Sequence, residues 1–592
     1  MIKRICIIPA LLFSFSFSQL TSSYLIIPEL AIPYVDSCAQ FWMNAWDDAN
    51  GGFYSNIDRY GNVNTSWGTH KHLLSQSRNV YGLTRAFMLT GDTTYLDLAQ
   101  EGNQWMIDHN WDYSYGGWYG ELNSNGNPNY PNSDKSAFDQ HYALLGPIAL
   151  YEATQDSSTW NIIMDGYQWI EDVYWDNRAG YEGYYDVANH SGTSAWGKSF
   201  NATVDAITTH LLYLYLMTED DSYLDRLVEL ADEIQTYLVG SMPNQAIGFA
   251  EKYDSNWNID NNETMTIMGH VLKTAWCLGR IWRLTANDDY IPVAETLLYD
   301  VWDNGYDHDF GGPYKDYNRV TGEMLMWGIP DTAKAWWQME QAIVGGLELA
   351  EPFDNTIAIE MADETTSFFM THFVDHEYGD VYENRTRYGD ETWGLHKGSS
   401  YKAGYHSIET GYYIYLYTNL FIHENPVTLY YRFGEYSEDR QVKLTPLAIA
   451  DDHLKIASVI HDSTQWNQFL AEERLLIIPA NTEGIFAVTF EPVEPVISIA
   501  SDDITVPSLM FSNAPNPFNN STEFKFNMHT SGIAEIRFVD IRGREVARPI
   551  IGEYRSGMNY VKFSDHGLAS GMYFAILKTP TGQSTRRIVL MK

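Results

Sequence analysis

The sequence predicts an all-α barrel of six helical hairpins, an (α/α)6 barrel, followed by two small all-β sandwich domains. Three observations support this fold class: a six-fold repeat of about 65 residues, two helical patterns in every repeat, and alternating strand patterns after Pro426. A chain of 592 residues is long enough for several domains.

The first 23 residues have the pattern of a secretory signal peptide. Lys3 and Arg4 precede an apolar run from Ile5 to Phe17, and small polar residues follow it. A membrane anchor is the alternative, but a span needs about 20 apolar residues, and this run is shorter and interrupted by Ser. We therefore expect export, removal of residues 1–23 and no transmembrane segment in the remaining chain.

The composition limits the partners. A formal net charge of −40 would repel the phosphates of nucleic acid, which excludes it as a partner. Of the three cysteines, Cys6 leaves with the signal peptide, and we expect Cys38 and Cys277 to be buried rather than bridged. The 19 Trp and 42 Tyr serve mostly core packing, but flat rings also stack on sugars.

A glycine-aromatic segment recurs through the first 400 residues. Its first copy reads GGFYSNIDRYGN from Gly51, a pattern typical of a short hairpin with a tight turn. The intervals between the aligned glycines are 65, 66, 65, 64 and 67 residues. These glycines are Gly52, Gly117, Gly183, Gly248, Gly312 and Gly379.

Two amphipathic helical patterns separate successive glycine-aromatic segments. The run NVYGLTRAFMLTGD after Arg78 returns apolar residues every three or four positions, and TTYLDLAQEGNQWMIDHNW does the same. Twelve such helices bury their apolar faces if they close into a double ring over residues 24–425, with the hairpins at one rim. An open solenoid is the alternative, but six units with bulky aromatic residues favour closure around a cavity.

Strand patterns dominate the rest of the chain. Runs such as VTLYYRF and IFAVTFEPV predict a β-sandwich over residues 426–495, and residues 496–508 have the composition of a linker. Residues 509–592 resemble the C-terminal sorting domain of the type IX secretion system. The motifs are PNPF from Pro515, a turn from Asp540 and SGMY from Ser570. The resemblance implies a secreted or cell-surface protein and the secretion machinery as a partner.

Two polar clusters at predicted helix starts fit a sugar site. The Arg78 guanidinium could bind hydroxyls or stabilise an enediolate, although an ordinary solvated charge is the alternative. Trp337, Gln338 and Glu340 follow one another closely, as in a sugar-binding platform, although paired tryptophans could also be core packing.

Two further clusters pair a histidine with a charged residue three positions later, on one helix face. His270 precedes Lys273, and His406 precedes Glu409. An imidazole with an ordinary pKa of about 6.5 suits removal of a proton from carbon near neutral pH. For a single helical histidine simple packing is the alternative, but two similar sites in one barrel favour chemistry.

Together these clusters resemble the N-acylglucosamine 2-epimerase superfamily, which includes cellobiose and mannobiose 2-epimerases and aldose-ketose isomerases. The resemblance covers roughly Gln40 to His423. It rests on four motifs: Gln76-x-Arg78, Gly269-His270, Trp336 to Glu340, and Lys402-x-x-Tyr405-His406.

The resemblance implies ring opening of a mono- or oligosaccharide and transfer of its C2 proton through an enediolate. His270 and His406 match the two bases, and Arg78 would stabilise the oxygen of the intermediate. No metal or cofactor is expected, because HExxH, CxxC and P-loop motifs are missing. The expected substrate-binding residues are Asn201, Asp205, Lys273, Trp337, Gln338, Glu340, Tyr405 and Glu409.

Three positions depart from the family pattern. Asp205 stands where the family usually has a third histidine, Lys273 where it has Glu, and Glu409 where it has Arg. The last two predict a charge swap: Lys273 and Glu409 would form an ion pair of reversed polarity. A carboxylate seldom shuttles protons near pH 7, so Asp205 suggests altered ring opening or substrate choice.

Two other functions remain open. The same barrel architecture hosts glycoside hydrolases or lyases with paired carboxylates. A non-catalytic surface protein that binds glycans is the second alternative. Carboxylates available for a hydrolase are Asp139, Asp205, Glu251, Glu340 and Glu409.

Overall fold

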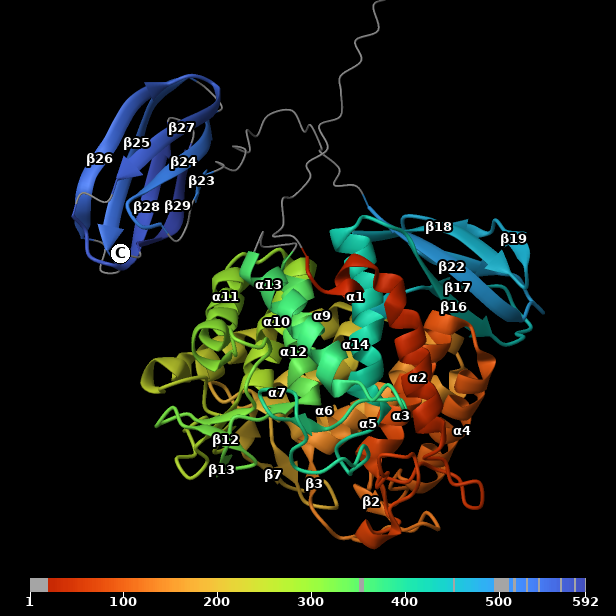
Figure 1. Cartoon of the computed structure of the whole chain (residues 1–592). Helices are drawn as coiled ribbons and strands as arrows, with labels where there is room; N and C mark the ends of the chain where they lie inside the picture. Colours follow the sequence, from red (N-terminus) through yellow and green to blue (C-terminus); the bar gives the residue numbers. More distant parts are fainter. Residues whose placement is uncertain are drawn as a thin grey trace, which may run out of the picture. The chain divides into compact units, whose positions relative to one another are not determined.

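The computed structural model describes residues 20–350, 356–450, 453–493, 511–514, 518–528, 531–540, 544–564, 567–579, 582–590 and 592. The chain forms two compact units, one up to Glu494 and one from Pro495 (Figure 1). The predicted signal peptide, apart from its last four residues, and the predicted linker lie outside the described residues.

Six inner helical segments form a closed ring in the first unit. Contacts run from α3 to α5, α7, α10, α12 and α14 and then back to α3, which confirms the barrel over the open solenoid. These helices are buried almost all round, since they pack against the barrel interior and an outer layer. The inner segments are α3 (Leu73–Thr90), α5 (Ala137–Thr154), α7 (Phe200–Ala206) with α8 (Leu212–Thr218), α10 (Met268–Thr285), α12 (Trp336–Ala350) and α14 (Gly404–Tyr417).

Six outer helices cover this ring. Five of them pack on the inner helix that precedes them, whereas α2 packs on α14, the last helix of the barrel. The hydroxyl of Tyr34 in α2 donates to the carbonyl of Ser407 in α14 at 2.8 Å. The outer helices are α2 (Ala31–Met43), α4 (Thr93–His109), α6 (Ser157–Tyr174), α9 (Asp221–Glu233), α11 (Tyr290–Asp300) and α13 (Thr356–Phe368).

The short strands of the repeats gather at one end of the helices, here called the hairpin rim (Figure 1). The inner helices begin at this rim, because each follows the strand or loop of its repeat directly. Labelled strands there are β2 (Glu121–Leu122), β3 (Lys135–Ser136), β7 (Ala195–Trp196), β12 (Met324–Met326) and β13 (Ile329–Pro330).

In five of the six repeats, a buried lysine forms an ion pair with an aspartate of the hairpin segment. In the first, Lys71 Nζ lies 2.8 Å from an Asp47 carboxylate oxygen and also donates to the Gly51 carbonyl. In four of these repeats the lysine stands two residues before the inner helix, the position that Thr266 has in the fourth repeat, whereas Lys397 stands further from α14. The pairs are Lys71–Asp47, Lys135–Asp112, Lys198–Asp176, Lys334–Asp307 and Lys397–Asp375.

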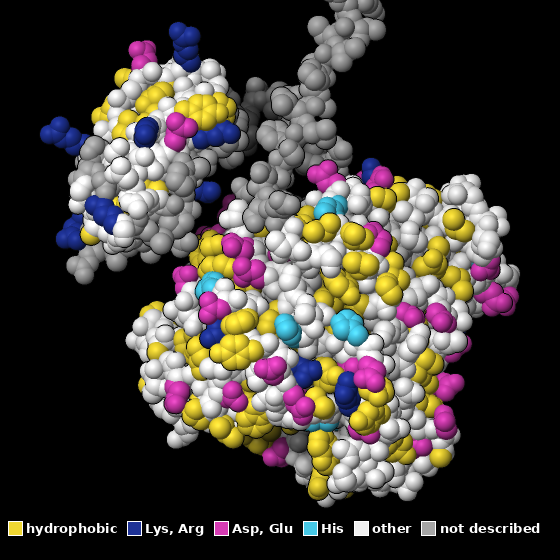
Figure 2. All heavy atoms as spheres, viewed as in Figure 1, with side chains coloured by type: hydrophobic (Ala, Val, Ile, Leu, Met, Phe, Trp, Pro, Cys, Tyr) yellow, Lys and Arg dark blue, Asp and Glu magenta, His cyan; other side chains and the backbone are white. Residues whose placement is uncertain are grey.

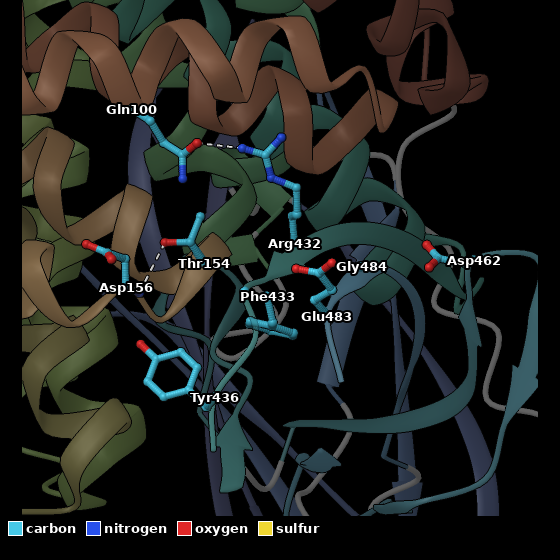
Figure 3. Close-up of a pocket in the computed structure, with 10 residues that line it drawn as sticks. Gln100, Thr154, Asp156, Arg432, Phe433, Tyr436, Asp462, Glu483 and Gly484 are labelled. Carbon is cyan, nitrogen blue, oxygen red and sulfur yellow. Dashed lines mark hydrogen bonds between the residues drawn. The ribbon is translucent and has the colours of Figure 1, made fainter. Parts of the chain in front are cut away.

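A β-sandwich closes the other end of the barrel. Its strand β16 packs on α3 and α5, so its core is continuous with that of the barrel. A cleft of about 460 Å³ at this junction is lined in part by Gln100, Arg432 and Tyr436 (Figure 3). One sheet has the order β16 (Val427–Phe433), β22 (Gly484–Pro492), β18 (Leu454–His461), β19 (Thr464–Trp466), and the other β17 (Arg440–Lys443), β21 (Leu475–Ile478), β20 (Phe469–Leu470).

The second unit is a separate all-β sandwich. Its two sheets enclose a core that includes Phe524, Phe538 and Phe563. One sheet has the order β23 (Phe511–Ala514), β24 (Ser521–Met528), β27 (Gly557–Ser564), and the other β26 (Glu545–Tyr554), β25 (Gly532–Asp540), β28 (Gly571–Thr579), β29 (Gly582–Leu590).

Candidate active site

The two candidate bases lie in the first turns of inner helices, at the hairpin rim. His270 is the third residue of α10 and His406 the third residue of α14. The half-buried indole of Trp337, at the start of α12, lies near both: its ring centroid is 5.3 Å from that of His270 and 6.1 Å from that of His406. The barrel thus brings together both histidines and the predicted sugar platform.

A carboxylate fixes the orientation of His270. Its Nδ1 lies 2.8 Å from Glu251 Oε2, while Glu251 Oε1 accepts from the backbone N–H of Ile267 at 3.0 Å. The imidazole also stacks on Phe200, with ring centroids 3.8 Å apart. Since Nδ1 is engaged, Nε2 is the ring nitrogen available for proton transfer.

His406 is held in a similar way but is more deeply buried. Its Nδ1 lies 3.2 Å from Glu340 Oε2. Burial, together with the positive charges of Arg78, Lys273 and Lys402, holds the pKa of His406 well below its ordinary value. The imidazole is therefore neutral near pH 7, the form that accepts a proton.

Two buried carboxyl groups meet behind His406. Burial and the neighbouring Glu409 raise the pKa of Glu340 well above its ordinary value, so we infer that the two carboxyls share a proton. The Tyr81 hydroxyl donates to Glu409, and the Gln341 amide donates to Glu340. One ligand atom each from Glu340, His406 and Glu409 lies within 4.8 Å of the others, so among the described residues this is the group that could hold a metal ion.

Arg78 lies beside His406 among aromatic rings. Its guanidinium carbon is 4.6 Å from the ring centroid of Tyr142 and 5.7 Å from that of Tyr405. It donates a hydrogen bond to the carbonyl of Tyr401, in the loop before α14. Arg78 is 4% exposed, so the alternative of a solvated helix charge is wrong.

The predicted charge swap between Lys273 and Glu409 is wrong. Lys273 Nζ lies 2.6 Å from Asp205 and 3.2 Å from the Tyr142 hydroxyl, and the Asn201 amide donates to Asp205 at 2.9 Å. Burial disfavours the charged ammonium, but Asp205, Tyr142 and Cys277 together outweigh burial and raise the pKa of Lys273. Two departures from the family pattern, Asp205 and Lys273, thus form one ion pair, because α7 and α10 are neighbours in the ring.

Gln338 is occupied by protein contacts. Its amide oxygen accepts from the Gly269 backbone N–H at 2.9 Å, and its amide nitrogen lies 3.3 Å from Asp316. A Cβ at Gly269 would approach the Trp337 ring to 2.5 Å, which explains the glycine before His270. These contacts fix the start of α10 against α12.

Sequence reasoning missed three partners of the site. Glu251 was a candidate for hydrolysis only, and Tyr81 and Tyr142 were not selected. Glu251 stands three residues after the aligned glycine of its repeat, and its carbonyl accepts from the Phe200 N–H at the start of an inner helix. Alignment of all six repeats at this position would have placed it at the rim.

A closed six-hairpin barrel with two carboxylate-held histidines at its rim defines a carbohydrate-active (α/α)6 enzyme. The N-acylglucosamine 2-epimerase (GlcNAc 2-epimerase) family model matches residues 52–409. The chain belongs to this family of sugar epimerases and isomerases.

Curated relatives match the barrel. The cellobiose 2-epimerase of Bacteroides fragilis is 22% identical over 62% of this chain and 93% of its own length. The D-mannose isomerase of Marinomonas mediterranea is 22% identical over 64% of this chain and 94% of its own length. The structure of a cellobiose 2-epimerase from Spirochaeta thermophila, 20% identical, has the same fold, with a TM-score of 0.57 over 66% of this chain and 96% of that one.

The second unit decides the location. The model of the secretion system C-terminal sorting domain matches residues 514–591. The chain is therefore a secreted or cell-surface protein. Within the described part of the chain, no helix combines the length and apolar character needed to cross a bilayer.

Proposed function

We propose that the chain is a sugar 2-epimerase or aldose-ketose isomerase that acts at C2 of an aldose or reducing-end sugar. The observation that carries this proposal is the pair of imidazoles, His270 and His406, each held at Nδ1 by a glutamate carboxyl group near the Trp337 ring. A reaction that removes a proton on one face and returns it on the other needs two such groups.

The proton steps balance without an oxidant or reductant. After ring opening, one histidine takes the C2 proton, and the electron pair moves onto the C1 carbonyl oxygen to give an enediolate. Return of a proton to the opposite face of C2 re-forms the C1 carbonyl and gives the epimer, while protonation at C1 with transfer of the hydroxyl proton from O2 to O1 gives the ketose. The Arg78 guanidinium stabilises the negative oxygen, as a preformed positive charge in a site shielded from water.

The remaining residues divide into binding and positioning roles. Trp337 offers a ring for the sugar, and Tyr405 lies between Arg78 and His406, with its ring centroid 4.1 Å from that of His406. Asn201, Asp205 and Lys273 form a polar group that would bind sugar hydroxyls. Glu340 and Glu409 set the protonation state of His406. Gln338 positions Gly269 and Trp337. The similarity to a cellobiose 2-epimerase and a D-mannose isomerase favours a glucose- or mannose-configured reducing end.

The carboxylates fit hydrolysis less well. Inverting glycosidases need carboxyls about 6.5–9.5 Å apart, and retaining ones about 5–5.5 Å. Glu340 and Glu409 offer oxygens within 4.8 Å of each other, which is closer than either arrangement requires. Asp205 is paired with Lys273, and Glu251 with His270.

Incubation of the secreted chain with cellobiose, mannobiose and mannose in D₂O tests the proposal. We expect deuterium at C2 and appearance of the epimer or ketose in the NMR spectrum. Cleavage of the disaccharides without C2 exchange would replace the proposal with a hydrolase. Binding without exchange or cleavage would support a glycan-binding protein instead.

A further inference from the structure

A Trp-Gly dipeptide recurs in the hairpin loops of four repeats. Each copy precedes an inner helix, and each tryptophan is unusually exposed for a residue type that proteins mostly bury. Among the described residues these four are the exposed tryptophans. They are Trp67 (51% exposed), Trp196 (42%), Trp327 (48%) and Trp393 (38%).

The backbone at these dipeptides adopts positive φ angles, which are unfavourable for residues other than glycine. The glycine of every copy has a positive φ, between 74° and 105°. Trp327 and Trp393 also have positive φ, 53° and 56°, which bulky residues rarely adopt. Trp327 and Gly328 form the two-residue turn between β12 and β13, where Met326 pairs with Ile329. A strained residue at an exposed tip points to a function rather than to packing.

Neighbouring side chains fix three of the rings. Trp67 packs edge-on against His396, with centroids 4.6 Å apart. The Trp393 indole N–H donates to Asp331 at 3.0 Å. The Lys315 ammonium lies 3.9 Å from the Trp327 ring centroid. Rings that are already ordered lose little entropy when a ligand stacks on them.

A series of contacts leads from one of these rings, Trp67, to the active site. His396 Nε2 lies 2.9 Å from Glu383 Oε2, and the Glu383 carbonyl accepts from the Trp336 backbone N–H, next to Trp337. Repeats five, six and one, which carry Trp327, Trp393 and Trp67, are neighbours in the closed ring, because α12 contacts α14 and α14 contacts α3. Figure 2 shows hydrophobic side chains between Asp and Glu over the hairpin end of this face.

We infer that Trp67, Trp327 and Trp393, the tryptophan arc, bind the non-reducing part of an oligosaccharide whose reducing end occupies the active site. An uncharged sugar chain fits because the C–H face of a pyranose stacks on an aromatic ring while its hydroxyls stay in water. The strongly acidic chain disfavours an anionic polymer. The inference rests on the proposed function and names its substrate class as oligosaccharides longer than a disaccharide.

Chain-length dependence tests the arc. The probes are β-1,4-linked glucose and mannose oligosaccharides of two to six units, with dissociation constants from calorimetry and kcat/KM from C2 exchange. For the wild type we expect affinity to rise about tenfold or more from two to six units, as ring contacts add. The Trp67→Ala/Trp327→Ala/Trp393→Ala variant should lose this rise and keep wild-type turnover of the disaccharide. Trp196→Ala, in repeat three across the ring, is the matched control and should keep the rise.

Three results would overturn the inference. They are equal wild-type affinity for two and six units in both series, a triple variant that keeps the rise, or tryptophan-dependent self-association of the chain in sedimentation. The proposed function can fail separately. Disaccharide exchange without length dependence removes the arc alone, whereas length-dependent binding without exchange removes the epimerase and keeps the arc.

Discussion

His270 and His406 both contact a glutamate carboxyl group through Nδ1, but their surroundings differ. His270 is bound to Glu251, a carboxylate anchored by a backbone N–H, and its side chain is 14% exposed. His406 is 7% exposed, and its partner Glu340 belongs to a buried carboxyl pair. We therefore expect the two proposed bases not to be interchangeable, because the proton that we place between Glu340 and Glu409 acts on His406 and not on His270.

Replacement of each base should give the largest effect and would break the comparison if the two were equivalent. His270→Asn and His406→Asn should each lower epimerisation by about 10²–10⁴-fold, the usual contribution of a general base. Each variant should still exchange the C2 proton of one epimer, a different epimer in each case, because the remaining base reaches one face. NMR in D₂O from each pure epimer measures this. Equal loss of exchange from both epimers in both variants would contradict two-base transfer.

The next largest effect is expected from the Asp205–Lys273 ion pair. Lys273 is one of the cations that lower the pKa of His406. Asp205→Asn should destabilise the barrel by about 3–5 kcal/mol, because it leaves a buried ammonium unpaired. Asp205→Asn combined with Lys273→Met should regain much of this loss. Urea unfolding followed by tryptophan fluorescence reports the first unit alone, as the chain has no Trp after residue 494.

Urea unfolding also distinguishes the Asp205–Lys273 ion pair from the ion pair between Lys273 and Glu409 that the sequence predicted. Lys273→Glu combined with Glu409→Lys should recover no stability over either single change. A double variant with wild-type stability would restore the charge-swap interpretation.

The smallest effect is expected in the pH profile of kcat/KM, which tests the difference between His270 and His406 most directly. Burial and, after it, Glu409 raise the pKa of Glu340, so Glu409→Gln should lower that pKa, increase the ionised fraction of Glu340 and favour the imidazolium of His406. The pKa of His406 then rises, and the acid limb of kcat/KM should move to higher pH. Glu251→Gln, at the other base, should lower the rate without moving this limb. An acid limb that stays in place or moves to lower pH in Glu409→Gln would argue against the shared proton.

The repeat made the fold predictable from sequence. Six glycines at even spacing predicted the barrel, and the ring of inner helices confirms it. Cys38 and Cys277 are buried and free, as expected. The C-terminal motifs identified the sorting domain, which the family model matches.

Side-chain partners across the ring were less accessible. Lys273 pairs with Asp205 rather than Glu409 because the ring places α7, 68 positions earlier, beside α10. Helical periodicity fixes which face a residue occupies but not which neighbour meets it. The buried lysines and the Trp-Gly dipeptides also repeat along the sequence. Their structural roles could be recognised only from the buried Lys–Asp pairs and the positive φ values in the structure.

The contact between α2 and α14 has a consequence for folding. It joins residues 373 positions apart, whereas most helix pairs of the barrel are near neighbours in sequence. Local helical hairpins form quickly, but long-range closure is slow and costs chain entropy. Helix content should therefore precede activity during refolding, because the barrel is complete only when α2 has packed against α14, its last helix.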